Sequence, residues 1–252
     1  MISPIKEPVE YKSTTQLKKI IQPGKVVDTF RFYGGKVEFN LAQDSRIVRA
    51  HTNRYVVYEF WHCVQEDPGR IIQIAEHLHS RRDPVTSVFM QDSWYKMRDH
   101  YVRAALFFLF NCYSDDGLIS SGNLSYRGFN PLLFNRIKNC SFENVRINFY
   151  KDEEMIKGID YLEGGDYLVL PLGKYNYNLF EEGKSYGVEA TPVNHQAIKI
   201  KFDTLDRKTI LLYKYHREVM ELYQNHNITM IDKYGNQTTE RDKCDEVIIA
   251  NF

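Results

Sequence analysis

The chain has 252 residues, of which 43% are hydrophobic and 26% charged, a balance that excludes disordered and collagen-like proteins. It carries 33 Lys and Arg against 33 Asp and Glu, so any attraction to nucleic acid or to an acidic membrane has to be local. The longest apolar runs, Ala104–Phe110 and Tyr167–Leu172, are shorter than the ~20 residues that span a bilayer. Met1–Thr15 carries four charged residues where a signal peptide has an apolar core, so we expect a soluble, cytoplasmic protein without a membrane partner.

The chain has four cysteines that are far apart in the sequence: Cys63, Cys112, Cys140 and Cys244. Their spacing fits neither a CxxC metal site nor a small disulfide framework, so we expect reduced thiols, most of them in the core. His77 and His79 are the closest histidine pair, but two residues apart on a helix they lie on different faces. The sequence therefore predicts no metal site.

The first half of the chain predicts the opening of an α/β sheet. Lys25–Thr29 and Arg46–His51 are short β-prone runs, and the glycine-marked connection Phe30–Leu41 lies between them. Asp67 followed by Pro68 is typical of a helix start, with the aspartate as N-cap. Three helices are expected, the last being the longest: Arg54–Val64, Asp67–Ser80 and Ser93–Asn111.

The second half predicts an insert and then more strands. Cys112–Asn130 is rich in Ser, Gly, Asn and Asp, which is typical of an irregular insert or hairpin. Helices are expected at Thr191–Thr204, with Thr191 as N-cap, and at His216–Asn225. Five β-prone runs are Val145–Tyr150, Tyr167–Leu172, Thr209–Tyr215, Ile228–Asp232 and Glu246–Asn251. A mostly parallel α/β sheet that ends in an antiparallel hairpin, joined by the turn Lys233–Lys243, resembles the Rossmann-like methyltransferase fold.

Four segments, in chain order, resemble one enzyme family. Val27-Asp28-Thr29-Phe30 with the following Gly34-Gly35 is similar to a cofactor loop in which Asp-x-Phe precedes a glycine-rich turn. Asp116–Asn130 is similar to a target-recognition segment, Gly165-Asp166-Tyr167 to a Gly-Asp-Phe before a catalytic strand, and Glu246–Phe252 to a terminal Glu-Val-Leu-Ile-x-Asn-Tyr. This series resembles the Dam-like class of DNA N6-adenine methyltransferases, including its small phage enzymes. The resemblance implies a single methyltransferase-like domain over residues 1–252, with a helical or irregular insert at 81–140 that corresponds to the target-recognition region.

The catalytic position departs from this family. Where the family has Asp-Pro-Pro-Tyr, the chain has Pro171-Leu172-Gly173-Lys174. In the family, the carboxylate and a proline carbonyl accept hydrogen bonds from the target amino group, and the aromatic ring stacks on the flipped adenine. Tyr175, one position later, could still stack but cannot supply the acceptor. We therefore expect no catalytic residues here.

The cofactor position departs as well. The resemblance places S-adenosylmethionine at five positions: Asp28, Phe30, Gly34, Gly35 and Thr52. Arg31–Tyr33 crowd the glycine turn, which has to leave room for the ligand. Thr52 stands where an acidic residue binds the ribose hydroxyls. We therefore expect the chain to bind no S-adenosylmethionine and no other cofactor.

The segment Lys174–Tyr186 interleaves cations with aromatic rings. Lysines can contact phosphates, and rings can stack on bases with ~1–3 kcal/mol each. Aromatic-rich loops are also typical of protein interfaces. The residues expected to bind nucleic acid are Lys174, Tyr175, Tyr177, Lys184 and, on the insert, Arg127.

These features predict a catalytically inactive Dam-like methyltransferase homologue that serves as a DNA-binding or scaffold subunit of a phage or viral assembly, in the host cytoplasm. Protein partners are expected, either a larger assembly or an active paralogue. Two alternatives remain open. One is a purely structural protein-interaction subunit, and the other is an active DNA N6-adenine methyltransferase that uses S-adenosylmethionine through divergent motifs.

Overall fold

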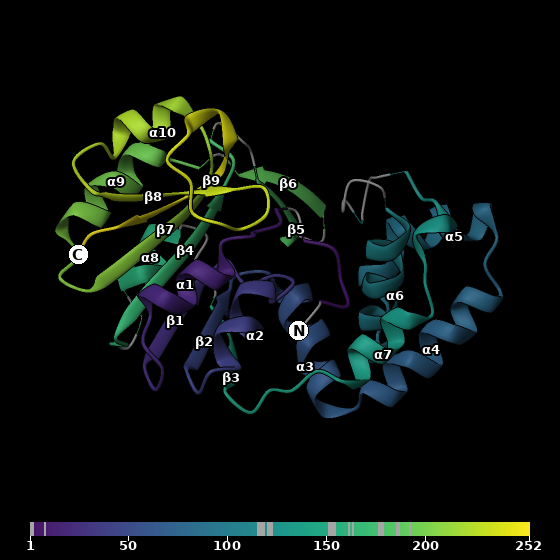
Figure 1. Cartoon of the computed structure of the whole chain (residues 1–252). Coiled ribbons are helices and arrows are strands. Elements are labelled where there is room, and N and C mark those ends of the chain that lie inside the picture. Colours follow the sequence, from purple (N-terminus) through teal and green to yellow (C-terminus); the bar gives the residue numbers. More distant parts are fainter. Residues whose placement is uncertain are drawn as a thin grey trace. The chain divides into compact units, whose positions relative to one another are not determined.

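A seven-stranded sheet, built from strands of both the N-terminal and the C-terminal parts of the chain, is the main sheet of the computed structural model (Figure 1). The structure describes residues 3–7, 9–114, 119, 123–150, 155–160, 162, 164–175, 179–184, 187–191 and 193–252. The strands of this sheet are β1 (Val26–Phe30), β2 (Ile47–Thr52), β3 (Val145–Phe149), β4 (Tyr167–Gly173), β7 (Lys208–Lys214), β8 (Asn227–Asp232) and β9 (Cys244–Ala250).

The order of these strands is β3-β2-β1-β4-β7-β9-β8. The first five strands are parallel to one another, whereas β9 runs antiparallel to both β7 and β8. This mostly parallel sheet with an antiparallel end confirms the predicted Rossmann-like methyltransferase fold.

Helices cover the sheet: α1 (Thr14–Ile20), α2 (Lys36–Ala42), α8 (Met155–Asp160), α9 (His195–Thr204) and α10 (Arg217–Leu222). Tyr167–Leu170 of β4 is buried at every position, which is typical of a central strand covered on both faces. On one face, Phe30, Leu170 and Leu211 pack with Ile198 of α9 in a single apolar cluster. A short 3-10 helix, η3 (Arg241–Lys243), leads into β9.

A second group of elements is mostly helical: α3 (Tyr55–Glu66), α4 (Pro68–Ser80), α5 (Pro84–Ser93), η1 (Trp94–Lys96), α6 (His100–Tyr113), η2 (Tyr126–Gly128), α7 (Leu132–Lys138), and the hairpin β5 (Leu179–Lys184) and β6 (Gly187–Thr191). Every residue of α6 from Ala104 to Tyr113 is buried, so Ala104–Phe110 is the centre of a core helix, as expected. Within the described part of the chain, no helix is both long and apolar enough to cross a membrane.

The chain divides into two compact units. The helical unit comprises Met1–Pro8, Arg54–Phe142 and Leu179–Thr191, and the sheet unit comprises Val9–Asn53, Glu143–Asn178 and Pro192–Phe252. The segment 81–140, predicted as an insert, lies within the helical unit. All four cysteines are free thiols, and Cys63 and Cys112 are buried.

Three helix starts follow the rule that an aspartate accepts hydrogen bonds from the first turn. Asp67, Asp83 and Asp99 cap α4, α5 and α6. The expected helix Ser93–Asn111 is therefore wrong at its start, because η1 ends at Lys96 and a new helix begins after Asp99. The helix α5 was not predicted, although Asp83-Pro84 repeats the Asp-Pro signal of α4.

The hairpin β5–β6 corrects two further expectations. The sequence predicts a loop at Lys174–Tyr186, but Leu179–Lys184 forms β5. Thr191 is not an N-cap, because it is the last residue of β6. The cap of α9 is Asn194, whose side-chain oxygen accepts from the backbone N–H of Ala197 at 3.0 Å.

Candidate functional site

The turn after β1 is filled by the chain's own rings. Gly35 has a left-handed conformation with φ of 78°, and a Cβ atom there would lie 2.4 Å from Cε2 of Phe39 and 3.1 Å from Cε2 of Phe32. Both phenylalanines are buried. In nucleotide- and cofactor-binding turns, the open face of such a glycine lets the ligand approach the backbone. Here aromatic side chains occupy that space.

Asp28, expected in the cofactor loop, is the centre of a buried ion cluster instead. Its carboxylate accepts from Nε and Nη2 of Arg49 at 2.8 and 2.7 Å, lies 2.9 Å from Nε2 of His51, and is bonded by Arg207. Burial alone would raise the pKa of Asp28, but the hydrogen bonds from His51, Arg49 and Arg207 outweigh it and lower the pKa to about 2. Asp28 is therefore ionised at neutral pH and already fully paired.

Gly165 leaves the room that this cluster needs. A Cβ atom at Gly165 would lie 2.4 Å from Nη2 of Arg207 and 2.7 Å from Oδ2 of Asp28. Gly165 belongs to the Gly-Asp-Tyr segment before β4, and its local role in the structure is this close approach of two charged side chains. Thr52, at the ribose position, is buried at the end of β2.

A buried tyrosine, Tyr11, forms hydrogen bonds with the backbone at the end of β4. Pro171, Leu172 and Gly173 belong to the strand, and Leu172 is buried in the core. The backbone N–H of Gly173 donates to the hydroxyl of Tyr11 at 2.7 Å, and that hydroxyl donates to the carbonyl of Leu212 at 3.4 Å. Backbone groups and a buried tyrosine thus surround the segment that the sequence resemblance places at the catalytic position.

After the end of β4, the ring of Tyr175 packs against two histidine rings. The ring centroid of Tyr175 lies 4.5 Å from that of His195 and 4.9 Å from that of His216. Nδ1 of His195 lies 3.0 Å from the hydroxyl of Tyr213, and burial first, then Arg31 and His216, lowers the pKa of His195 to about 4. His195 is therefore uncharged at neutral pH, and Tyr175 packs on imidazoles of its own chain.

The five residues expected to bind nucleic acid are distributed over both units. Lys174, which is exposed, and Tyr175 belong to the sheet unit. Arg127, exposed in η2, and Lys184, the last residue of β5, belong to the helical unit. Tyr177 lies outside the described residues. No single unit gathers the four described residues, and their role in nucleic acid binding stays a prediction.

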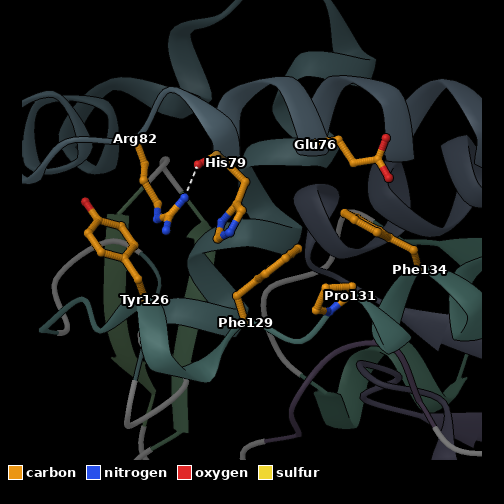
Figure 2. A pocket seen from close by; sticks show the side chains of 7 residues that line it. All are labelled: Glu76, His79, Arg82, Tyr126, Phe129, Pro131 and Phe134. Carbon is orange, nitrogen blue, oxygen red and sulfur yellow. Dashed lines mark hydrogen bonds between the residues drawn. The ribbon is translucent and has the colours of Figure 1, made fainter.

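A groove in the helical unit has a volume of about 430 Å³ (Figure 2). Its lining consists of Glu76, His79, Arg82, Tyr126, Phe129, Pro131 and Phe134, and we call it the ring groove. Glu76 and His79 lie three residues apart on α4 and therefore share a helix face, and Arg82 follows just beyond the end of that helix at Ser80. The segment from η2 to α7 supplies the other wall.

Stacked rings build the floor of the ring groove. The ring centroids of His79 and Phe129 lie 3.9 Å apart, and those of Phe129 and Phe134 lie 5.4 Å apart. The guanidinium carbon of Arg82 lies 5.4 Å from the ring centroid of Tyr126, and Nη1 of Arg82 donates to the carbonyl of His79 at 2.6 Å. Such a groove suits a planar, partly polar ring.

Two hydrogen bonds fix these rings. The hydroxyl of Tyr126 donates to Oγ of Ser87 at 2.7 Å, and Nδ1 of His79 lies 2.7 Å from the hydroxyl of Tyr113. Burial raises the pKa of Tyr113, so its hydroxyl keeps its proton. Burial first, and then Arg82, lowers the pKa of His79, so its imidazole is neutral at pH 7.

The sequence pointed to single residues of the ring groove but did not show that they lie together. Tyr126 and Phe129 stand out as rings in a Ser- and Gly-rich stretch, and Arg82 belongs to a basic pair with Arg81. The spacing of Glu76 and His79 was the remaining signal, because it predicts one face of a helix. Within the described ranges, no three His, Cys, Asp or Glu side chains gather where they could hold a metal ion.

No protein family model matches the chain, and no curated protein matches it. One similar solved structure is the crystal structure of a fibrillarin/Nop5p complex, with a TM-score of 0.38 and 11% identity, covering 96% of this chain and 81% of that chain. Another is TehB from Haemophilus influenzae, with a TM-score of 0.37 and 10% identity, covering 96% of this chain and 61% of that one. The chain thus spans less than two thirds of TehB. The fold assignment rests on the order and direction of the strands.

Proposed function

We propose that this protein has a methyltransferase fold without methyl transfer activity and serves as a DNA-binding subunit of a larger assembly. The observation that carries the first part is the turn after β1, where Phe32 and Phe39 fill the space beside Gly35. The end of β4 supports it too, because the backbone N–H of Gly173 already donates a hydrogen bond to the hydroxyl of Tyr11. The sequence resembles the Dam-like class of enzymes, including its small phage members. We therefore extend the proposal to an assembly of a phage or virus.

The protein is expected not to bind S-adenosylmethionine, because the ligand would have to displace two buried phenylalanine rings. Isothermal titration calorimetry should show no saturable heat up to about 1 mM ligand, which corresponds to binding weaker than about −4 kcal/mol. An active methyltransferase titrated with the same ligand stock is the control. A dissociation constant in the low micromolar range, or tritium transfer from the cofactor to DNA, would support the active alternative instead.

DNA binding is supported by exposed cations beside aromatic rings. Arg82 is exposed at the ring groove, and Arg127, next to Tyr126, is exposed as well. Because the formal net charge is zero, such a surface has to act locally. Phosphate contacts release counterions, so the affinity should fall with rising salt.

Fluorescence anisotropy with a labelled single strand at several salt concentrations tests this binding. Arg127→Gln and Lys174→Gln are each expected to flatten the log–log slope by about 0.7–1 unit, since each removes one phosphate contact. Lys243→Gln is the control, because Lys243 is exposed and paired with Glu240. Absence of binding at low salt, or a slope that neither variant changes, would contradict DNA binding.

A protein-interaction role is the second candidate, and one observation favours it. Val85, Val88 and Phe89 form an apolar stripe on α5 and are 80%, 56% and 70% exposed. Exposed apolar stripes of this kind are typical of interaction surfaces. If the anisotropy experiment finds no DNA binding, this stripe makes the scaffold role the better proposal.

A further inference from the structure

The ring groove has the size and shape for one planar ring. Its volume of about 430 Å³ lies in the range of about 300–1,000 Å³ that is usual for small-molecule sites. Glu76 lies on α4, which ends at Ser80, and Arg82 follows just beyond that end. A single unpaired base enters such a groove, whereas a base pair within a duplex keeps both of its faces stacked.

The walls offer stacking rather than hydrogen bonding. Phe129 and Phe134 contact each other, and His79, uncharged at neutral pH, stacks on Phe129. Every base has a π-face, so stacking of about 1–3 kcal/mol per base attracts all four bases alike. Preference for one base over another has to come from the polar groups at the two ends of the groove.

These two ends carry opposite charge. Figure 2 shows Arg82 at the Tyr126 end of the groove and Glu76 at the Phe134 end. The cation at the first end, with exposed Arg127 following Tyr126 in the chain, suits a phosphate. The carboxylate of Glu76 is an acceptor only, so it suits N–H donors. Glu76 is exposed, so its carboxylate is accessible to such a donor.

We infer that the ring groove binds one unpaired base of single-stranded DNA, and that Glu76 makes it prefer a base with an exocyclic amino group over thymine. The inference rests on the proposed DNA binding and names the part of the DNA that is recognised. Cytosine and thymine are pyrimidines of similar size. Cytosine presents an amino group to the carboxylate, whereas thymine presents a carbonyl oxygen in its place, which the carboxylate repels.

The test compares labelled oligonucleotides (dC)12 and (dT)12 by fluorescence anisotropy with the full chain. The unmodified protein should bind (dC)12 about fivefold or more tightly than (dT)12. Glu76→Gln should reduce this preference below about twofold, because an amide offers both a donor and an acceptor. Asp92→Asn, which removes an exposed carboxylate of the same unit outside the groove, should leave the preference unchanged.

A second measurement locates the base. An oligonucleotide that contains one 2-aminopurine should change its fluorescence on binding, with a loss of the quenching by its neighbour bases, because the base leaves them and stacks in the groove beside Phe129. Phe129→Leu should reduce this change at saturation, whereas Phe89→Leu, at an exposed ring outside the groove, should not. Melting curves show whether each variant is folded.

The outcomes separate this inference from the proposed function. Equal affinity for (dC)12 and (dT)12, with a salt slope that Arg127→Gln still flattens, overturns the base preference and leaves DNA binding in place. A cytosine preference that survives in Glu76→Gln also overturns it. Absence of binding to either oligonucleotide at low salt overturns both.

Discussion

Asp28→Asn is expected to lower the free energy of unfolding by about 3–5 kcal/mol, because it leaves two buried guanidinium groups without their carboxylate. Asp28 is fully buried, and the side chains of Arg49 and Arg207 are 17% and 16% exposed. Asparagine has nearly the same shape, so the effect reports the lost charge and not a cavity. Urea unfolding followed by circular dichroism measures it. Asp206→Asn, at an exposed position beside Arg207, should change the free energy by less than about 0.5 kcal/mol.

The same cluster gives the protein an acid-sensitive stability. The folded-state pKa of Asp28 is about 2, below its ordinary value of 3.8. The stabilisation is therefore complete above about pH 4 and is lost as the pH falls toward 2, where the carboxylate takes up a proton in the folded state too. Unfolding curves at several pH values should show this loss in the unmodified protein and a flatter acid limb in Asp28→Asn. Equal acid limbs in the two proteins would contradict the ion cluster.

Glu246→Ala is expected to cost about 3 kcal/mol of stability, because Glu246 joins three donors inside the sheet unit. It lies buried on β9, where Oε1 accepts from the backbone N–H of Lys12 at 2.7 Å and from Nζ of Lys214 at 2.8 Å. Oε2 accepts from the backbone N–H of Ser13 at 3.0 Å. Ser13 is the N-cap residue of α1, so the carboxylate also lies at the positive end of that helix.

Thermal and urea unfolding of a matched pair test this role. Glu246→Gln should cost about half as much as Glu246→Ala, because the amide keeps one acceptor for the backbone donors. Glu240→Ala removes an exposed glutamate that pairs with Lys243 and should change stability by less than about 0.5 kcal/mol. If Glu246→Ala were as mild as Glu240→Ala, the contacts of Glu246 with Lys12 and Ser13 would contribute nothing.

The strands were predictable because their signal is local. Tyr167–Leu172 and Glu246–Asn251 are apolar runs of the length of a buried strand, and they form β4 and β9 with shifts of one or two residues. The β5–β6 hairpin escaped prediction because Leu179–Lys184 contains two glutamates, a glycine and a lysine, all poor strand formers. Its strands are defined by their pairing with each other, which composition does not reveal.

The candidate sites depend on contacts between distant residues and were therefore less predictable. The residues next to Asp28 in the sequence resemble a cofactor loop. One of its partners in the structure, Arg207, lies 179 positions further along the chain. Crowding of the glycine turn was expected from Arg31–Tyr33, whereas the ring closest to Gly35 belongs to Phe39, inside α2. The ring groove needed α4 and the segment from η2 to α7 to face each other, and no spacing within either segment indicates this.

The path of the chain limits how the two units can be exchanged in evolution. The helical unit is assembled from three separate segments and the sheet unit from three others, so the chain passes five times from one unit to the other. Lys6, for example, donates from Nζ to the carbonyls of Cys112 and Ser114 at 3.0 and 2.8 Å, which ties the first segment to the end of α6. A single crossover in the gene therefore cannot exchange one whole unit and leave the other whole. The filled cofactor turn lies in segment 9–53 and the ring groove in segment 54–142, so a crossover near residue 53 would separate these two features but would also divide both units.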